Sequence, residues 1–511
     1  MLIFVVGLIL RIQTVDDSAA HIDEAYTFSQ VGKLELVVDW RAEARLPSLA
    51  RWLAVPGFML GGPGNDLSLH SSPLLGWAGL YICINAILLS QRMKAGAIAA
   101  SLFLAFEPFI IGYSVYMKQD MVLAAAIAAM LFAALSKRRW VIYLAVGLPL
   151  ASKWTGGIMP LILVIYWLFF PPIWMKTKTF NNRMKAIFSW GVKAFIAMLL
   201  TFFILNPWYI THQPETLGVI SNFTAFNHDD AISEECIGAC AKSVFETSDV
   251  WWFYVPFHTL QLSPFFQAMI VLGFVSLLSK QQHIRSTAAM GALAWLVPFV
   301  TYSFIISIDA RHYAPVFLPG LLLLSGAGIE WLIIIATQIV TVSATNEQST
   351  WIKPISIIVI VISGSLWASS IGPEYREWTW RDIEDPYGGS TRTMWEEKIV
   401  HDEMRNEVGV HLTNHPGKEG PRICTNYDFE VIWYEYPGGR RHYWMDSIER
   451  HWGNCEFIIY SKYWVGDNLQ HEGVKLLYDI WHGDDDERFK AIRPEQCQDI
   501  ECHVMAFKVL K

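Results

Sequence analysis

Two adjacent carboxylates, Asp23 and Glu24, follow the first apolar stretch of the chain. Such a pair beside an apolar segment suits the removal of a proton from a hydroxyl group, because one carboxylate acts as the base while its neighbour binds the acceptor or tunes the base. A second interpretation fits equally well at this point, since the helix dipole favours acids at a solvated helix N-terminus. The carboxylate pair alone does not decide between catalysis and a helix start.

Other charged residues lie at the ends of later apolar stretches. Lys118 and Asp120 come just before one of them, Lys153 separates two more, and Arg311 follows Asp309 in a short connection. An ammonium binds phosphate as a point charge, and a guanidinium binds it with two parallel hydrogen bonds. The alternatives are an acid at a helix start, a snorkelling lysine and an Arg–Asp pair.

Together with the carboxylate pair, these charges would suit a transferase that acts on a membrane-anchored sugar phosphate. The cations would hold the phosphate leaving group, and a carboxylate would activate the acceptor hydroxyl.

The composition favours a membrane protein as the setting for this chemistry. The 511 residues are 53% hydrophobic and 17% charged, with a mean hydropathy of +0.30. An ordinary soluble domain is about 45–50% apolar and about 25% charged. A soluble multidomain enzyme, a disordered chain and a nucleic-acid binder are therefore excluded, and the 23 Trp and 29 Phe suit membrane interfaces and lipid-facing surfaces.

Hydropathy predicts about eleven membrane spans, because each needs roughly 20 apolar residues to cross the hydrocarbon. They lie at 1–15, 73–90, 95–113, 119–136, 139–151, 154–170, 186–206, 264–280, 287–308, 313–340 and 352–371. The first is short, and a removed signal peptide is the alternative. No basic segment precedes its apolar run and no small-residue cleavage site follows it, which favours a span.

The positions of basic residues predict which side each connection faces. Four short connections are rich in Lys and Arg and are expected in the cytoplasm: 91–94, 137–139, 176–185 and 280–285. The long segments 16–72, 207–263 and 372–511 alternate with them and are expected outside. We therefore expect a multi-pass protein of the plasma membrane, bacterial or archaeal rather than of the endoplasmic reticulum, with its active site and C-terminal domain outside the cytoplasm.

Charge divides the chain into two predicted domains. Residues 373–511 hold 27 of the 47 acids and 17 of the 39 bases, a net charge of −10, whereas the preceding residues have a net charge of +2. This contrast predicts a membrane domain at 1–371 and a soluble domain at 372–511. Apolar residues at helical spacing predict a helix at 393–412, and short apolar runs predict strands at 421–425, 456–460, 474–480 and 503–509, the first two buried. The fold class is thus a multi-pass α-helical membrane protein with a small extracytoplasmic α/β domain.

Six of the seven cysteines lie in polar segments, and Cys83 lies in an apolar run. The six are disulfide candidates, since an even number outside the membrane suits an oxidising compartment: Cys236, Cys240, Cys424, Cys455, Cys497 and Cys502. Free thiols are the alternative. The spacings are poor zinc signals, because no second ligand pair accompanies them. We expect a disulfide between Cys236 and Cys240, whose three intervening residues can turn tightly, and leave the other connectivity open.

Six segments, at 21–24, 45–52, 105–108, 114–120, 150–156 and 248–252, resemble the protein O-mannosyltransferases and the related lipid-A aminoarabinose transferases, which belong to the GT-C superfamily of polyprenyl-phosphate-sugar transferases. Residues 21–24 match the Asp-Glu motif of the first outside loop, and 45–52 resemble the His-Pro-Pro-Leu-x-Lys segment of that loop. Residues 150–156 are similar to the Ser-x-Lys-Trp-x-Gly stretch, which is the most specific match. Further similarity lies at 105–108, 114–120 and 248–252. The resemblance covers roughly residues 1–320 and omits the C-terminal domain.

Two departures from the family pattern concern the lipid phosphate and the acceptor. Val115 stands where the family has an Arg that contacts the phosphate, and Lys118 lies about one helical turn further on. The acid expected before the loop motif falls on Ala44, where Glu43 or Asp39 would have to replace it.

The resemblance implies a role for each candidate residue. Asp23 would be the general base and Glu24 would orient a substrate, without a metal or other cofactor. The lipid phosphate would be bound by Lys118, Lys153 and Arg311. The full set of candidates for substrate binding is Lys118, Asp120, Lys153, Trp154, Arg311, Arg45 and Glu43.

The expected reaction is inverting transfer of a hexose, with mannose as the first candidate, from a polyprenyl- or dolichyl-phosphate donor. The acceptor would be a protein Ser or Thr hydroxyl, with a lipid or glycan hydroxyl as the alternative. The expected partners are therefore the lipid-linked sugar, membrane lipids and an acceptor protein or glycolipid. A rival interpretation is a non-catalytic transporter or receptor. Transporters tend to place charges near the membrane midplane and to contain internal repeats, whereas here the charges gather at one predicted surface.

The topology generates a first prediction. A reporter enzyme that is active only outside the cytoplasm, fused after Lys511, is expected to give signal, because the predicted span count is odd and the tail follows the last span. The matched control is the same reporter inserted in the basic connection at 137–139, which is expected to be silent. Signal from a cytoplasm-active reporter at the tail would contradict the assignment.

Overall fold

A computed structural model gives the fold of the chain. It describes residues 1–16, 49–61, 70–115, 119–136, 138–172, 175, 179–211, 262–304, 314–343, 391–414, 420–425, 440–444, 454–461, 472–494, 497 and 504–510. These residues cluster into two compact units. The first includes Ser71–Thr379 and the second Trp380–Lys511, each with shorter segments from the first 70 residues. The predicted boundary at 371–372 lies outside the described residues.

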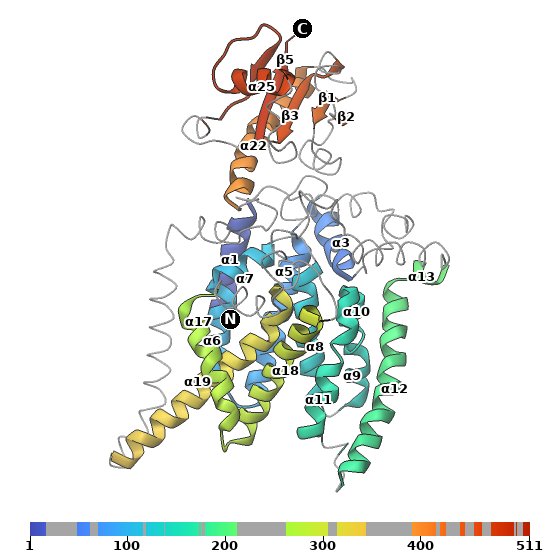
Figure 1. Cartoon of the computed structure of the whole chain (residues 1–511), viewed down its shortest axis with the longest axis vertical. Coiled ribbons are helices and arrows are strands. Elements are labelled where there is room, and N and C mark those ends of the chain that lie inside the picture. Colours follow the sequence, from blue (N-terminus) through green and yellow to red (C-terminus); the bar gives the residue numbers. More distant parts are fainter. Residues whose placement is uncertain are drawn as a thin grey trace. The chain divides into compact units, whose positions relative to one another are not determined.

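The first unit is built from apolar helices (Figure 1). They are α1 (Leu2–Asp16), α3 (Leu49–Gly61), α5 (Ser71–Ser90), α6 (Lys94–Phe106), α7 (Pro108–Val115), α8 (Gln119–Ala134), α9 (Arg139–Ala145), α10 (Leu148–Ser152), the 3₁₀ helix η2 (Trp154–Ile158), α11 (Leu161–Phe169), α12 (Phe180–Leu205), α13 (Trp208–Thr211), α17 (Pro264–Val275), η5 (Ser276–Leu278), α18 (Gln282–Phe304) and α19 (Ala314–Ser343). Of α1 and α3, only the residues up to Arg11 and up to Leu53 belong to this unit, and the remainder of each helix groups with the second.

Ten of the eleven predicted spans coincide with these helices, and the span at 352–371 lies outside the described residues. Within the described residues, four helices are long and apolar enough to cross a membrane, or up to five if the bent pair α6–α7 is one span. The chain is therefore a multi-pass helical membrane protein, and the count of eleven stays a prediction. The helix α3 was not predicted; it lies inside the expected outside loop at 16–72.

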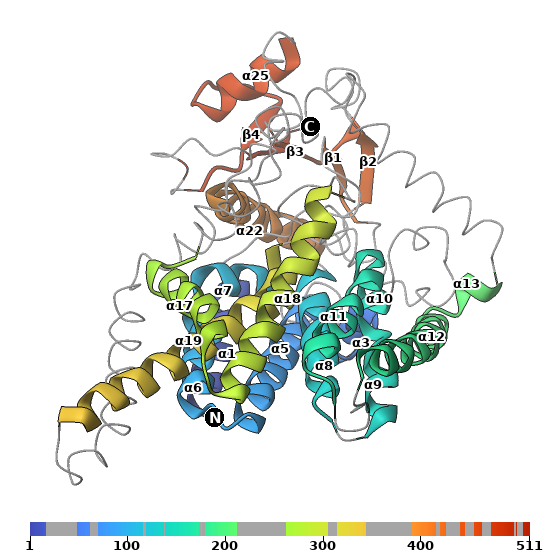
Figure 2. The same cartoon turned by 60° about the horizontal axis from the view of Figure 1, so that its bottom comes forward.

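Close packing of α19 holds one half of this unit together. In Figures 1 and 2, α19 runs beside α6, α17 and α18, which are its main neighbours together with α8. A Cβ atom on Gly96 of α6 would lie only 2.5 Å from the carbonyl oxygen of Gly326 on α19. Since lipid offers apolar helices no hydrophobic drive to associate, small residues that let two backbones approach are a principal source of their attraction.

The predicted span at 95–113 is broken rather than straight. Helices α6 and α7 meet at an angle of 61°, and we call the break at 106–108 the elbow. Its cause is Pro108, which has no N–H group to donate to the carbonyl of Leu104 one turn earlier. Other groups must bond the freed backbone oxygen, because lipid cannot.

The second unit contains a five-stranded mixed sheet with the strand order β2-β1-β3-β5-β4. The strands are β1 (Arg422–Thr425), β2 (Arg440–Trp444), β3 (Phe457–Ser461), β4 (Phe489–Ala491) and β5 (Val504–Val509). Strand β1 is parallel to β2 and β3, whereas β5 is antiparallel to β3 and β4. Residues from α22 (Thr391–Asn414) and α25 (Glu472–Trp481) complete a buried core with the sheet.

The α/β prediction for this unit is confirmed, with one wrong element. The helix at 393–412 and the strands at 421–425, 456–460 and 503–509 are present. Residues 474–480 form most of α25 instead of a strand. The alternation of Leu476, Tyr478 and Ile480 resembled a strand, but Leu477, Ile480 and Trp481 are the most buried residues and share one face of a helix. Strands β2 and β4 were not predicted.

Disulfides occur in the second unit. Cys424 of β1 is bonded to Cys455, with 5.9 Å between their Cα atoms, and Cys497 is also disulfide-bonded. Cys83 of α5 is a free thiol. The expected bridge between Cys236 and Cys240, and the candidate Cys502, lie outside the described residues.

Candidate functional site

Lys153 lies at a break between two short helices of the first unit. Its backbone is extended, with φ −156° and ψ 145°, so that α10 ends before it and η2 begins after it. The turn depends on Gly156, because a Cβ atom there would overlap the carbonyl group of Pro149. The Lys-Trp-x-Gly spacing found in the sequence is thus the local cause of the break, which projects an ammonium from the end of α10.

This ammonium is paired with Asp120, which comes from another helix. Lys153 Nζ donates a hydrogen bond of 2.7 Å to Asp120 Oδ1, and the two side chains are 17% and 3% exposed. Asp120 lies in the first turn of α8, and α8 packs directly against α10. The structure therefore brings together two predicted site residues, and Asp120, which does lie at a helix start, is buried and paired with Lys153. The Lys153 side chain remains partly exposed.

An aromatic cluster adjoins Lys153. The ring of Trp154 lies 5.0 Å from that of Phe202 and 5.4 Å from that of Tyr209, centroid to centroid. Phe202 is in the last turns of α12, and Tyr209 is in α13. Burial raises the pKa of the Tyr209 phenol, which the nearby Arg51 guanidinium partly offsets. Tyr209 therefore stays protonated at neutral pH and can act as a donor.

A second cation reaches this cluster from the predicted outside loop. Arg51 lies on α3 and is 3% exposed. The neighbouring Trp52 donates from Nε1 to the carbonyl of Leu205 at 2.9 Å, which fixes this part of α3 to the end of α12. Arg51 occupies the Lys position of the motif that residues 45–52 resemble. Arg51 was not among the site residues predicted from the sequence, although its position in this motif was a signal that could have identified it.

A second charged residue that was not predicted from the sequence, Arg11 of α1, contacts the elbow between α6 and α7. Arg11 of α1 is fully buried, and its guanidinium lies 4.0 Å above the ring of Trp77. It donates to the carbonyl of Leu104 and to the hydroxyl of Ser114, both at 2.6 Å. An ionisable residue inside a predicted span was the available signal, because such residues are costly there.

Glu107 holds the elbow from another direction. It is fully buried, and its two carboxylate oxygens accept hydrogen bonds from the backbone N–H and the hydroxyl of Ser263, at 2.8 and 2.7 Å. Ser263 is the N-cap residue of α17. The start of α17 is thus fixed to the break in the predicted third span, at the end of the expected outside loop at 207–263.

Comparison with solved structures identifies this arrangement of helices. The chain aligns with ArnT from Cupriavidus metallidurans in the apo state, with a TM-score of 0.56 and 13% identity, over 99% of this chain and 97% of ArnT. The same protein bound to undecaprenyl phosphate aligns with a TM-score of 0.50 and 14% identity over the same shares. The chain has a GT-C fold.

Other comparisons add little to the GT-C fold. An oligosaccharyltransferase from Archaeoglobus fulgidus, in complex with zinc and sulfate, aligns with a TM-score of 0.46 and 10% identity over 92% of this chain and 70% of its own. No family model and no curated protein sequence matches the chain. The resemblance noted in the sequence was therefore correct at the level of the fold, and the fold also extends over the C-terminal domain that the motifs did not cover.

Several predicted site residues of this GT-C chain cannot be placed. Those outside the described residues are Asp23, Glu24, Glu43, Arg45, Lys118 and Arg311. Val115, which stands where the related family has an Arg, is fully buried at the end of α7. An apolar and buried side chain cannot take the role of that cation.

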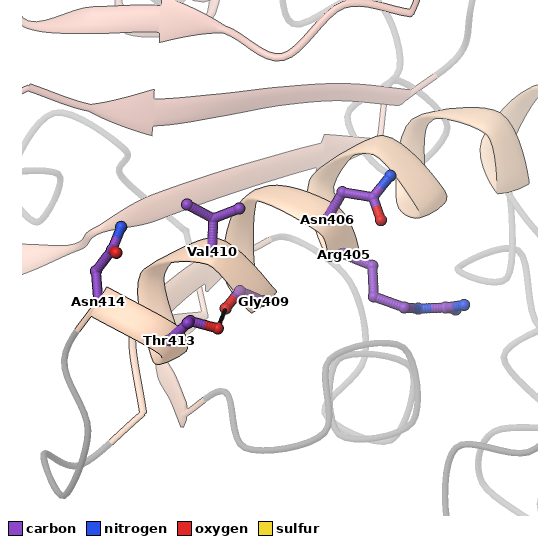
Figure 3. A pocket seen from close by; sticks show the side chains of 6 residues that line it. All are labelled: Arg405, Asn406, Gly409, Val410, Thr413 and Asn414. Atoms are coloured by element: carbon purple, nitrogen blue, oxygen red, sulfur yellow. Dashed lines mark hydrogen bonds between the residues drawn. The ribbon is translucent and has the colours of Figure 1, made fainter.

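A shallow cavity of about 410 Å³ lies along α22 in the second unit (Figure 3). The hydroxyl of Thr413 donates to the carbonyl of Gly409 within the helix itself. The residues that line the cavity come from successive turns of this one helix: Arg405, Asn406, Gly409, Val410, Thr413 and Asn414. It contains none of the site residues predicted from the sequence.

The ion pair generates a second prediction, on stability. Lys153→Met leaves the carboxylate of Asp120 buried without its ammonium, and we expect a loss of about 3 kcal/mol in the free energy of unfolding. Lys153→Met combined with Asp120→Asn removes both charges, and we expect it to cost less than Lys153→Met alone. Thermal unfolding of the wild type, of Lys153→Met, of Asp120→Asn and of the double variant in detergent measures the coupling energy between the two side chains. This energy is roughly 1–3 kcal/mol for side chains in contact. Strictly additive effects would show that the two side chains do not interact.

Proposed function

We propose that this chain is a glycosyltransferase that transfers a hexose, with mannose as the first candidate, from a polyprenyl- or dolichyl-phosphate donor to a protein Ser or Thr hydroxyl. The observation that carries the proposal is the Lys153 ammonium, held by a buried Asp120 at a helix break in a chain with the GT-C fold. ArnT, which shares this fold, has been crystallised with undecaprenyl phosphate. The proposal transfers that class of lipid to this chain.

In the proposed reaction, Asp23 removes the proton from the acceptor hydroxyl. The acceptor oxygen attacks the anomeric carbon and forms the glycosidic bond, while the bond from that carbon to the phosphate oxygen breaks with inversion. The electron pair stays on the lipid phosphate, whose charge increases in the transition state. Preorganised cations stabilise such developing charge, and the proposal assigns this role to Lys153. Glu24 orients a substrate, and the proposal includes no metal.

Three features support a role of Lys153 in binding the donor. Its side chain is 17% exposed whereas that of its counterion is 3% exposed, so that the lysine is the more accessible member of the pair. The rings of Trp154 and Tyr209 are next to it and offer apolar surface with a phenol donor. Arg51 adds a second positive charge beside Tyr209. Cations and aromatic surface are the groups expected around a lipid phosphate and its sugar.

The proposed location is the extracytoplasmic face of the plasma membrane of a bacterium or archaeon. Lysine bias in the connections favours this orientation. The disulfide between Cys424 and Cys455 supports it, because disulfides persist in oxidising compartments and are rare in the cytosol.

Asp23→Asn tests the reaction directly. We expect transfer from a radiolabelled polyprenyl-phosphate mannose to fall by about 10²–10⁴-fold, because the amide cannot accept the acceptor's proton, while donor binding is retained. The matched control is Asp16→Asn at the end of α1, which is expected to transfer at the wild-type rate. Assays with a Ser/Thr peptide, a glycolipid and a glycan as acceptor identify the acceptor class. Wild-type turnover by Asp23→Asn would remove Asp23 from the mechanism.

Donor affinity tests Lys153. The variant with both Lys153→Met and Asp120→Asn is expected to bind polyprenyl phosphate at least about tenfold more weakly, because the phosphate loses a charge-assisted contact and no unpaired carboxylate remains to explain the loss. Lys153→Arg is expected to restore part of the affinity, since a planar fork replaces a compact charge. The control is Lys193→Ala, an exposed lysine on α12. Normal affinity of the double variant at low and high salt would exclude Lys153 as a phosphate ligand.

A further inference from the structure

The guanidinium of Arg11 donates hydrogen bonds to three different helices at the elbow. Its Nε donates to the Ser114 hydroxyl at 2.6 Å and its Nη2 to the Leu104 carbonyl at 2.6 Å. Its Nη1 donates to the carbonyls of Ala105, at 3.2 Å, and of Gly7 in its own helix, at 2.8 Å. One guanidinium thus bonds the last turn of α6, the last turn of α7 and α1 at the same time.

The break at Pro108 explains why a guanidinium is suited to this position. The Leu104 carbonyl would accept from residue 108 in a continuous helix, but proline has no N–H to donate. The Trp77 indole also donates to this oxygen, at 2.8 Å. A neutral donor therefore already satisfies the freed carbonyl. What Arg11 adds is a rigid fork of five N–H donors that spans both arms of the bend.

The helices that Arg11 joins lead to the residues of the proposed reaction. Helix α1 precedes the carboxylate pair in the chain, and α7 precedes the segment with Lys118 and Asp120. Asp120 in turn holds Lys153. On the other side of the elbow, Glu107 fixes the start of α17.

We propose that Arg11 is a positioning residue for glycosyl transfer, which fixes the bend of the α6–α7 elbow and thereby the start of α8 with Asp120 relative to α1. This inference rests on the proposed function. It assigns Arg11 no contact with the donor or the acceptor. Misplacement of reacting groups by about 1 Å can cost 10²-fold in rate, so a change at the elbow is expected to act on kcat.

The experiment compares four variants of the full chain in lipid nanodiscs. Arg11→Met removes the fork, and Arg11→Lys keeps the charge without the fork. Arg11→Met combined with Pro108→Ala restores an N–H for the Leu104 carbonyl but lets the helix straighten. The matched control is Arg183→Met, since Arg183 also donates to a helix carbonyl, that of Leu168 at 2.6 Å, away from the elbow. The readouts are amide hydrogen exchange over 104–120, the thermal unfolding midpoint, and kcat and KM for transfer.

If Arg11 positions the elbow, Arg11→Met has faster exchange over 104–120 and a kcat reduced by about 10²-fold, with a smaller change in KM. Arg11→Lys folds as the wild type does but recovers only part of kcat. The variant that also carries Pro108→Ala regains exchange protection and thermal stability while kcat stays low. Arg183→Met keeps the wild-type kcat.

Recovery of kcat together with stability in the Pro108→Ala variant would overturn the proposal, because transfer would then not depend on the bend that Arg11 is proposed to fix. Full activity of Arg11→Lys would overturn the role of the fork. If the wild-type protein transfers no sugar, the proposed function fails, and the exchange measurement still tests the elbow: unchanged exchange over 104–120 in Arg11→Met would show that Arg11 does not hold it.

Discussion

A helix that breaks inside an apolar bundle must find hydrogen-bond partners for its own backbone, since lipid supplies none. At two of the breaks in the described part of the first unit, a charged residue is buried or partly buried. At the elbow, the carbonyl freed by Pro108 is bonded by Arg11 and Trp77. Between α10 and η2, Gly156 permits the sharp turn that releases Lys153 toward Asp120. The same constraint therefore accounts for the irregular backbone and for the positions of the charges.

The two breaks differ in what they leave accessible. Arg11 is fully buried, and its bonds hold helices together. Lys153 is partly exposed and is paired through one oxygen of a carboxylate that is itself nearly inaccessible. A fully buried charge suits a contact that holds two helices in a fixed arrangement. A partly exposed charge suits the binding of a second anion in addition to its counterion. The two proposals follow this division, with a supporting role at the elbow and donor binding at the turn that contains Lys153.

The sequence predicted most of the apolar helices, because long apolar runs are a strong signal, and it placed Asp120 and Lys153 among the site residues. It did not predict that they pair, since no local pattern reports which helices lie side by side. It missed Arg11 because a single charge hardly lowers the mean hydropathy of the segment 1–15. Residues 474–480 were misread because their apolar residues fit an alternating pattern as well as a helical face, and only packing against the sheet distinguishes the two.

The position of β5 within the sheet constrains how the second unit is made. Among the described strands β5 comes last in the chain, yet it lies between β3 and β4 and is the only strand that pairs with both. Until β5 has been synthesised and inserted, β4 has no neighbour in the sheet and one edge of β3 is open. The sheet is therefore completed only after β5 has been synthesised, and until then the open edge of β3 is a site where a chaperone or another strand can bind.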